Sequence, residues 1–155
     1  MPRFSEDLDF DTRNLNFTEF KGILEYVEKG LQKEGFIPEI IPKKKDNLYV
    51  AELYFKALMR VYEITDKRGW DLMIKIEVFK PQWRLTAESD VLSLYGYNFS
   101  AILLGKANML SEKICALFKR KQGRDIYDTL FMLRKQFPFN KNVLTANKIE
   151  GPPKE

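Results

Sequence analysis

The sequence contains no histidine and only one cysteine, Cys115. The absence of histidine excludes imidazole as a general base, rules out Cys/His pairs and removes nearly all zinc sites. A single cysteine excludes an internal disulfide, which suits a reducing cytoplasm. Any chemistry must therefore depend on carboxylates, lysines, arginines or a hard metal ion.

Long apolar runs are also missing, because no stretch approaches the roughly 18 consecutive apolar residues of a membrane span. The first residues, MPRFSED, lack the charged-then-apolar layout of an export signal. We therefore expect no membrane association and a cytoplasmic location. The length of 155 residues is that of one ordinary domain, and the net charge of +4 permits an anionic partner without requiring one.

The hydrophobic pattern predicts strands in the first part of the chain and helices in the last third. The predicted strands are 4–11, 48–63, 71–79 (paired with 48–63 in a hairpin) and 98–104, and the predicted helices are 18–34, 107–120 and 124–136. Thr18 is the predicted N-cap of the first helix, Gly35 its stop, and residues 42–47 a polar turn. This order indicates an α+β fold. We expect a sheet region with one long helix over 1–105, a helical region on the same core over 106–147, and a frayed tail over 148–155.

The first candidate for chemistry is the pair Asp7 and Asp9. Residues i and i+2 of a strand point the same way, so both carboxylates face one side, and two close like charges favour a cation between them. Oxygen ligands on a rigid strand suit Mg²⁺ or Mn²⁺, usually brought in with phosphates. The alternative is an exposed edge strand with a solvated acidic face.

The second candidate is Glu77, which shares the polar face of an otherwise apolar strand with Lys75. If that strand neighbours the first one in the sheet, three carboxylates meet in an arrangement typical of metal-assisted phosphoryl transfer. The alternative is a half-exposed strand of an antiparallel sheet.

The third candidate is the helical region, where Lys113 lies beside an apolar stripe and Arg124, Asp125 and Asp128 open the next helix. Structural explanations are a surface lysine, a helix-capping Asp125 and Arg124 as the ion-pair partner of Asp125. Cys115 falls among core-type residues and is expected to be a packing residue.

Four segments together resemble the AbiEii-type abortive-infection toxin nucleotidyltransferases, which belong to the polymerase-beta-like nucleotidyltransferase superfamily. They are RFSEDLDF at 3–10 (the R-x-S-x-D-[IL]-D-[LF] segment), IKIEV at 74–78 (the central K-[IV]-E-[IV] strand), LSEKICAL at 110–117 (the L-x-E-K-[LI]-x-A-L helix) and RDIYD at 124–128 (the R-D-x-x-D segment). They cover nearly the whole chain in the family's order. The resemblance implies a nucleotidyltransferase-like sheet flanked by helices.

The resemblance also implies roles for these residues. Asp7 and Asp9 would hold Mg²⁺ bound to a nucleoside triphosphate, and Glu77 would be the third acidic residue, as a metal ligand or a base. Lys113 would bind nucleotide phosphate, Asp125 would support that lysine or the nucleotide, and Arg124 would contact phosphate. The implied reaction transfers a nucleoside monophosphate to an acceptor with release of pyrophosphate. The implied acceptor is in some cases the tRNA 3′ end, and the usual partner is an antitoxin protein.

The sequence departs from the superfamily pattern in one respect. The superfamily places a Gly-Gly or Gly-Ser turn before the D-x-D strand, where backbone amides cradle phosphates, whereas neither pair occurs in this sequence. Three explanations stay open: a fragment of a longer product, a truncated gene start, or a degenerate relative that has lost catalysis. In the last case the chain would be an RNA- or protein-binding module.

Overall fold

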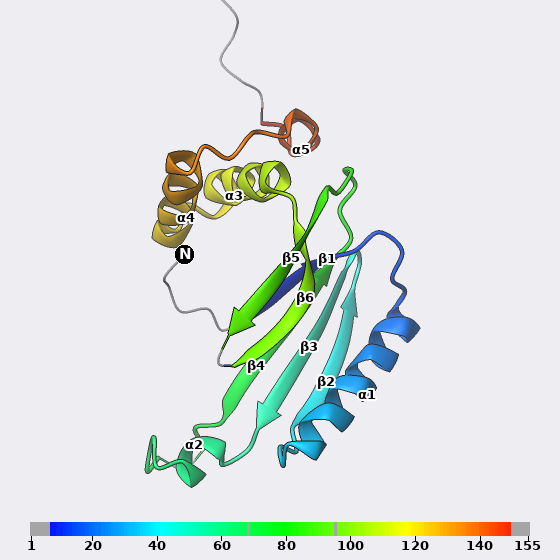
Figure 1. The fold of residues 1–155 in the computed structure, drawn as a ribbon, viewed down its shortest axis with the longest axis vertical. Helices are drawn as coiled ribbons and strands as arrows, with labels where there is room; N and C mark the ends of the chain where they lie inside the picture. Colours follow the sequence, from blue (N-terminus) through cyan, green and yellow to red (C-terminus); the bar gives the residue numbers. More distant parts are fainter. Residues whose placement is uncertain (1–6, 68, 95, 150–155) are drawn as a thin grey trace, which may run out of the picture. The chain divides into compact units, whose positions relative to one another are not determined.

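The computed structural model describes residues 7–67, 69–94 and 96–149. These residues divide into two compact units, 7–81 and 82–149, which are described in turn. Their mixed content of helices and sheets confirms the α+β prediction (Figure 1). The predicted start of the first strand, at residues 4–6, lies outside the described residues.

The first unit is a four-stranded sheet with a long helix. Its elements are β1 (Asp7–Asp11), α1 (Phe17–Lys33), β2 (Glu39–Lys45), β3 (Leu48–Phe55), the short α2 (Leu58–Val61) and β4 (Leu72–Phe79). The strand order is β1-β4-β3-β2. Strands β2, β3 and β4 are antiparallel neighbours, as the predicted hairpin requires, whereas β1 joins β4 in parallel.

Helix α1 begins one residue before its predicted start, and its N-cap is Asn16 rather than Thr18. The Asn16 side chain accepts a hydrogen bond from the Glu19 amide at 3.0 Å, and the Glu19 carboxylate accepts one from the Asn16 amide at 2.8 Å. This reciprocal capping box satisfies two amides at once, which Thr18, already inside the helix, does not do. Gly35 follows the helix with φ of 85°, which confirms the predicted stop.

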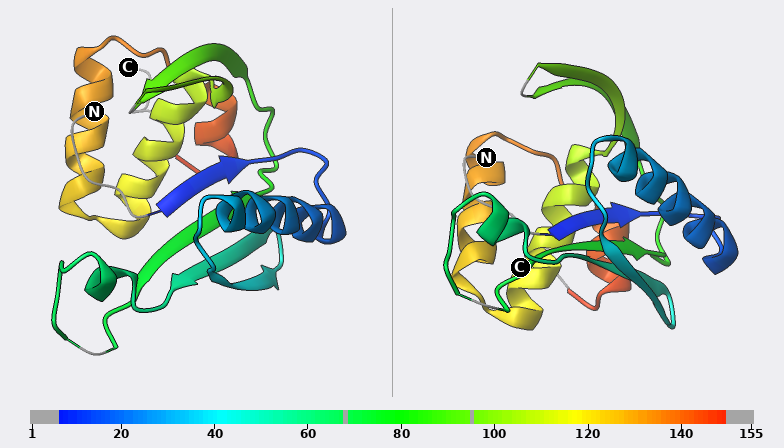
Figure 2. Two further views of the ribbon diagram at one scale, coloured as in Figure 1. Left: turned by 60° about the horizontal axis from the view of Figure 1, so that its bottom comes forward. Right: turned by 90° about the horizontal axis from the view of Figure 1, so that it is seen from below.

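The core of this unit lies between α1 and one face of the sheet (Figure 1, Figure 2). Phe20 and Leu24 of α1 are buried against alternate residues of β3, beginning with Tyr49, whose ring centroid lies 5.7 Å from that of Phe20. Because successive strand residues point to opposite faces, the intervening positions of β3 and β4 face away from α1. The candidate carboxylates lie on this second face, which we call the open face of the sheet.

Two boundaries differ from the sequence prediction. Residues predicted as a polar turn belong instead to β2, and the turn is shorter, with Asp46 at φ of 46°. Pro42 is tolerated in β2 because β2 is an edge strand, where a missing amide costs no ladder hydrogen bond. The long strand predicted after this turn ends at Phe55. Ala57 then turns the chain with φ of 59°, and its amide donates to the Asp71 carboxylate at 3.0 Å.

The second unit begins with a two-stranded antiparallel sheet and ends in helices. Its elements are β5 (Ala87–Leu94), β6 (Tyr97–Leu104), α3 (Lys106–Arg120), α4 (Gly123–Arg134) and α5 (Lys141–Ala146). Helices α3 and α4 confirm the predicted helices and pack side by side (Figure 2). Strand β5 and helix α5 were not predicted. Within the described ranges, no helix has the length and apolar character needed to cross a membrane.

Buried polar side chains join the elements of this second unit. Asn108 of α3 is fully buried, and its side-chain amide nitrogen donates to the Arg84 carbonyl at 3.1 Å. Its side-chain oxygen accepts from the Thr86 hydroxyl and from the Asn140 amide group, both at 2.9 Å. Asn108 therefore connects the base of the hairpin, α3 and the start of α5, since each of its polar atoms has a partner.

Candidate active-site residues

The parallel pairing of β1 with β4 sets the positions of the acidic residues in the first unit. The register places Asp7 opposite Lys75 and Asp9 opposite Glu77. Residues that lie opposite one another in a ladder share a face of the sheet, so all four side chains belong to the open face. The strands that carry Asp7, Asp9 and Glu77 are thus direct neighbours.

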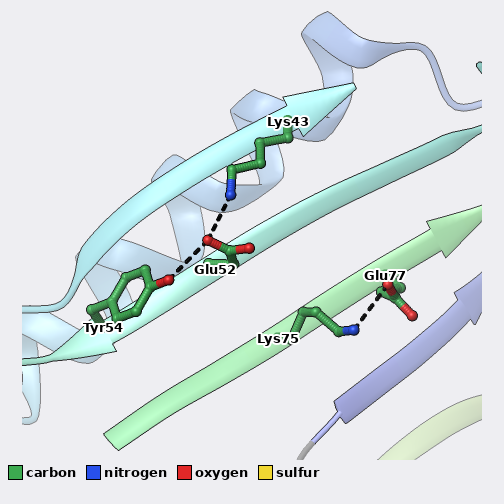
Figure 3. Close-up of polar contacts among 5 residues, drawn as sticks. All are labelled: Lys43, Glu52, Tyr54, Lys75 and Glu77. Carbon is green, nitrogen blue, oxygen red and sulfur yellow. Dashed lines mark hydrogen bonds and ion pairs between the residues drawn. The ribbon is translucent and has the colours of Figure 1, made fainter. Parts of the chain in front are cut away.

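The open face continues across β3 and β2 with further charged groups (Figure 3). Glu52 accepts from the Lys43 ammonium at 2.8 Å and from the Tyr54 hydroxyl at 2.9 Å. These hydrogen bonds, with Lys43 the larger cause, lower the pKa of Glu52. Glu52 therefore stays ionised and already has two partners within this network.

Lys75 forms the second ion pair of this face, with 3.1 Å between its Nζ and Glu77 Oε1 (Figure 3). The hydrogen bond to Glu77 is the largest cause of a raised pKa at Lys75, and the negative charges of Glu77, Asp7 and Asp9 add to it. Lys75 is therefore a permanent positive charge among the carboxylates at neutral pH.

Asp11 ends the acidic row on β1. Burial is the main cause that raises the pKa of Asp11 from 3.8 to about 6, and the charge of Asp9 raises it further. Asp9 and Asp11 therefore repel one another across two strand positions, as alternating carboxylates on one face should.

The donor set of this face fits Mg²⁺ brought in by a nucleotide better than a preformed metal cage. Among the described residues, no group of three or more acidic, histidine or cysteine side chains is close enough to hold a metal ion. Mg²⁺ needs only one or two protein carboxylates when substrate phosphates and waters supply its other ligands. Asp7 and Asp9 would supply two such carboxylates, and Glu77 forms an ion pair with Lys75.

The candidate residues of the second unit form two ion pairs. Lys113 of α3 lies 3.0 Å from Asp128 of α4, and the Asp128 side chain is fully buried. Asp125, also fully buried, is bound by Arg120 at 2.8 Å, and its second oxygen has no hydrogen-bond partner in the described part of the chain. The partner of Lys113 is therefore Asp128, and the partner of Asp125 is Arg120.

This pairing differs from the one that the sequence suggested. The resemblance implied that Asp125 supports Lys113 or the nucleotide, and Arg124 was considered as the ion-pair partner of Asp125. Arg124 is instead exposed near the start of α4, while Arg120 approaches Asp125 from the end of α3. Asp128 was named among the first residues of this helix, but neither Asp128 nor Arg120 was given an ion-pair partner, because a hydrophobic pattern does not separate a charged residue at a buried helical position from a surface charge. Cys115 is buried, and burial raises the pKa of its thiol, as expected for a packing residue.

A comparison with protein-family models decides the family. The model described as "Nucleotidyl transferase AbiEii toxin, Type IV TA system" matches residues 1–149.

The chain belongs to the AbiEii toxin nucleotidyltransferase family.

The match covers both units of this AbiEii family member, and so includes the acidic residues of β1 and β4 and the ion pairs of α3 and α4. Searches of curated proteins and of solved structures found no match to the chain. The family implies nucleotidyltransferase activity within a toxin–antitoxin system.

Proposed function

We propose that the protein is a metal-dependent nucleotidyltransferase of the toxin type. It transfers a nucleoside monophosphate from a nucleoside triphosphate to an acceptor, the tRNA 3′ end being the first candidate, and releases pyrophosphate. The observation that carries the proposal is the β1–β4 register, which sets Asp9 beside Glu77 and Asp7 beside Lys75 on the open face of the sheet. Family membership supplies the reaction class.

Asp7 and Asp9 are the residues that would hold Mg²⁺ or Mn²⁺. The ion, when bound, would neutralise charge that develops on the phosphates and orient them for in-line displacement. Glu77 is the proposed third acidic residue, as a further ligand or as the base that accepts a proton from the acceptor hydroxyl. A carboxylate base suffices here because phosphoryl transfer depends mainly on positioning and charge stabilisation.

Lys113 is the proposed phosphate-binding residue of the helical unit. Its side chain is 26% exposed, so the ammonium is reachable, while the buried Asp128 carboxylate fixes its position. Arg124 is proposed as a second phosphate contact because it is exposed at the start of α4. Asp125 is proposed to support the nucleotide indirectly, by holding Arg120, to which it is bound. An antitoxin protein is the proposed partner, and the cytoplasm the proposed location.

The experiment is nucleotide transfer from each of the four radiolabelled nucleoside triphosphates to bulk tRNA, with Mg²⁺ and with EDTA. Wild-type protein is expected to label tRNA only with Mg²⁺, and Asp7→Asn and Asp9→Asn each to lower the rate by at least about a hundredfold. Asp46→Asn is the matched control because Asp46 is exposed in the β2–β3 turn. Equal labelling by wild type and both variants would overturn the assignment.

A second candidate function is a non-catalytic relative that only binds RNA or protein. It is favoured by the ion pair with Lys75 that already engages Glu77, the proposed third acidic residue. The two functions separate in the same assay: a binding module retains tRNA or antitoxin in a pull-down but transfers no label with any nucleotide. Transfer of label to an acceptor excludes the second candidate.

A further inference from the structure

Lys75 occupies the centre of the open face. In the sheet register it lies between Asp7 on β1 and Glu52 on β3, and Glu77 follows two positions along its own strand. Side chains at such positions are nearest neighbours on one face of a sheet. The ammonium therefore has carboxylates on three sides, and its position in the sheet fixes this arrangement.

Of these carboxylates, Glu77 is the direct partner of Lys75. Glu52 is already bound by Lys43 and Tyr54, whereas Lys75 Nζ lies 3.1 Å from Glu77 Oε1. The two side chains are 29% and 30% exposed, so neither is locked in the interior. An ion pair at this exposure is weak enough to be exchanged for another partner.

We propose that Lys75 is an internal counter-cation of the acidic group formed by Asp7, Asp9 and Glu77. It offsets part of the negative charge of this group in the metal-free protein and gives up Glu77 when a divalent cation binds to the carboxylates. This inference rests on the proposed function, because it concerns the same acidic residues. It assigns Lys75 as a positioning residue, which controls the availability of Glu77.

The physical reason is competition between two positive charges. A unit charge and a divalent cation on one small acidic surface repel one another, and the pair at Glu77 must separate before Glu77 can serve a metal. Removal of the lysine charge should therefore tighten binding of a divalent cation. Without any cation, the same removal should leave the carboxylates to repel one another and destabilise the sheet.

The test is Mn²⁺ titration of the full chain by electron paramagnetic resonance, with and without a non-hydrolysable nucleoside triphosphate analogue. Lys75→Met and Lys75→Gln are expected to lower the Mn²⁺ dissociation constant of the nucleotide-free protein about five- to tenfold. Lys75→Arg keeps the charge and is expected to match wild type. In EDTA, Lys75→Met should melt below wild type, and Mn²⁺ should raise its melting temperature more than that of wild type.

Lys56→Met is the matched control because it removes the same charge from the residue that follows β3 in the same unit. Lys56 pairs with Glu39 at 2.6 Å and is 70% exposed. It follows β3 six positions beyond Val50, which lies opposite Glu77. At about 3.3 Å per residue it is about 20 Å from Glu77, beyond most screened interactions. Its Mn²⁺ affinity should therefore equal that of wild type.

Each outcome separates this inference from the proposed function. If wild type binds Mn²⁺ and labels its acceptor, but Lys75→Met and Lys75→Gln bind Mn²⁺ no more tightly, the counter-cation role is wrong and the proposed function stands. If no form binds Mn²⁺, even with the nucleotide analogue, both fail. Equal tightening in Lys56→Met would also overturn the inference, because the effect would then be one of net charge alone.

Discussion

Asp128 shows how a single buried charge is made tolerable. Its side chain is fully buried, yet Lys113 lies only 3.0 Å away, so the charge is compensated at short range. A buried carboxylate without such a partner would carry a large desolvation cost. The ion pair therefore serves the fold and holds the proposed phosphate-binding lysine in one place.

The first prediction concerns this pair. Asp128→Ala should lower the free energy of unfolding by about 2 kcal/mol, because it removes the buried partner and leaves a cavity, while Lys113 can still reach solvent. Lys113→Met should cost at least as much stability, because it removes the ammonium that compensates the fully buried Asp128 carboxylate, and it should abolish nucleotide binding. Urea unfolding and calorimetry with nucleoside triphosphates measure the two effects. An Asp128→Ala protein as stable as wild type would contradict the structural role of Asp128.

The second prediction concerns the pH dependence that Asp11 confers on the metal-free protein. Because the pKa of Asp11 is raised from 3.8 to about 6, the folded chain holds this proton more tightly than the unfolded chain. Its contribution to stability is thus full below pH 3.8 and is lost as the pH rises through about 6. As the pH rises from 4 to 7.5, the free energy of unfolding of Asp11→Asn should therefore increase by about 1 kcal/mol relative to that of wild type. Solvent screening makes this difference smaller than the full pKa shift would give.

Urea unfolding of wild type and Asp11→Asn in EDTA, repeated from pH 4 to pH 7.5, measures this difference. The two proteins share all other titrating groups, so their difference isolates Asp11. A difference that stays constant over this range would contradict the raised pKa.

At the scale of elements, the junction between β6 and α3 depends on Gly105. Its amide donates to the Thr86 carbonyl at 2.8 Å, and a Cβ at this position would overlap the Thr86 side chain. Thr86 cannot move aside freely because its hydroxyl donates to the buried Asn108. The close approach of the two backbones therefore requires glycine at this position.

The third prediction follows from this junction. Gly105→Ala should destabilise the protein by about 1 to 3 kcal/mol through overpacking, as measured by thermal and urea unfolding. Gly123→Ala is the control in the same unit, because a Cβ at Gly123 meets no atom within 4 Å and the residue begins α4. That variant should be as stable as wild type or slightly more stable. A Gly105→Ala protein as stable as wild type would show that the Thr86 side chain can move aside.

The sequence allowed three helices to be predicted, because α1, α3 and α4 each repeat apolar residues at helical spacing. Strand β5 escaped because its described residues are mostly exposed, so its sequence carries no clear alternation between a buried and an open face. The lysines of β2 were predicted as a turn because they too are exposed and show no alternation between buried and open positions. Strand alternation and family resemblance predict Asp7, Asp9 and Glu77 as candidate residues, and the structure shows only that their strands are neighbours. The Lys113–Asp128 pair requires the packing of two helices, which no local pattern encodes.

At the scale of the whole molecule, the proposed residues are divided between two units. The acidic group belongs to residues 7–81, and the lysine with its buried carboxylate belongs to residues 82–149. The chain as a whole carries a net charge of +4, although the acidic group itself is negative. A polyanionic acceptor would therefore depend on positive residues elsewhere on the chain.

The fourth prediction applies to that acceptor. Binding of tRNA should weaken by at least about tenfold between 50 and 200 mM KCl, because each phosphate contact releases a counterion. Fluorescence anisotropy with labelled tRNA measures the affinity at each salt concentration. An affinity independent of salt would contradict an electrostatic contact with the tRNA backbone. Asp7→Asn should leave the dependence of tRNA affinity on salt concentration unchanged.

The parallel pairing of β1 with β4 also has a consequence for biosynthesis. Asp7 leaves the ribosome before its neighbour in the ladder, Lys75, which is made about 70 residues later. Strands β2, β3 and β4 can form their antiparallel ladder from local contacts, while β1 must wait for a long loop to close. The acidic row is thus the last part of the sheet to be assembled, so the proposed metal-binding residues would come together only after β4 has been made.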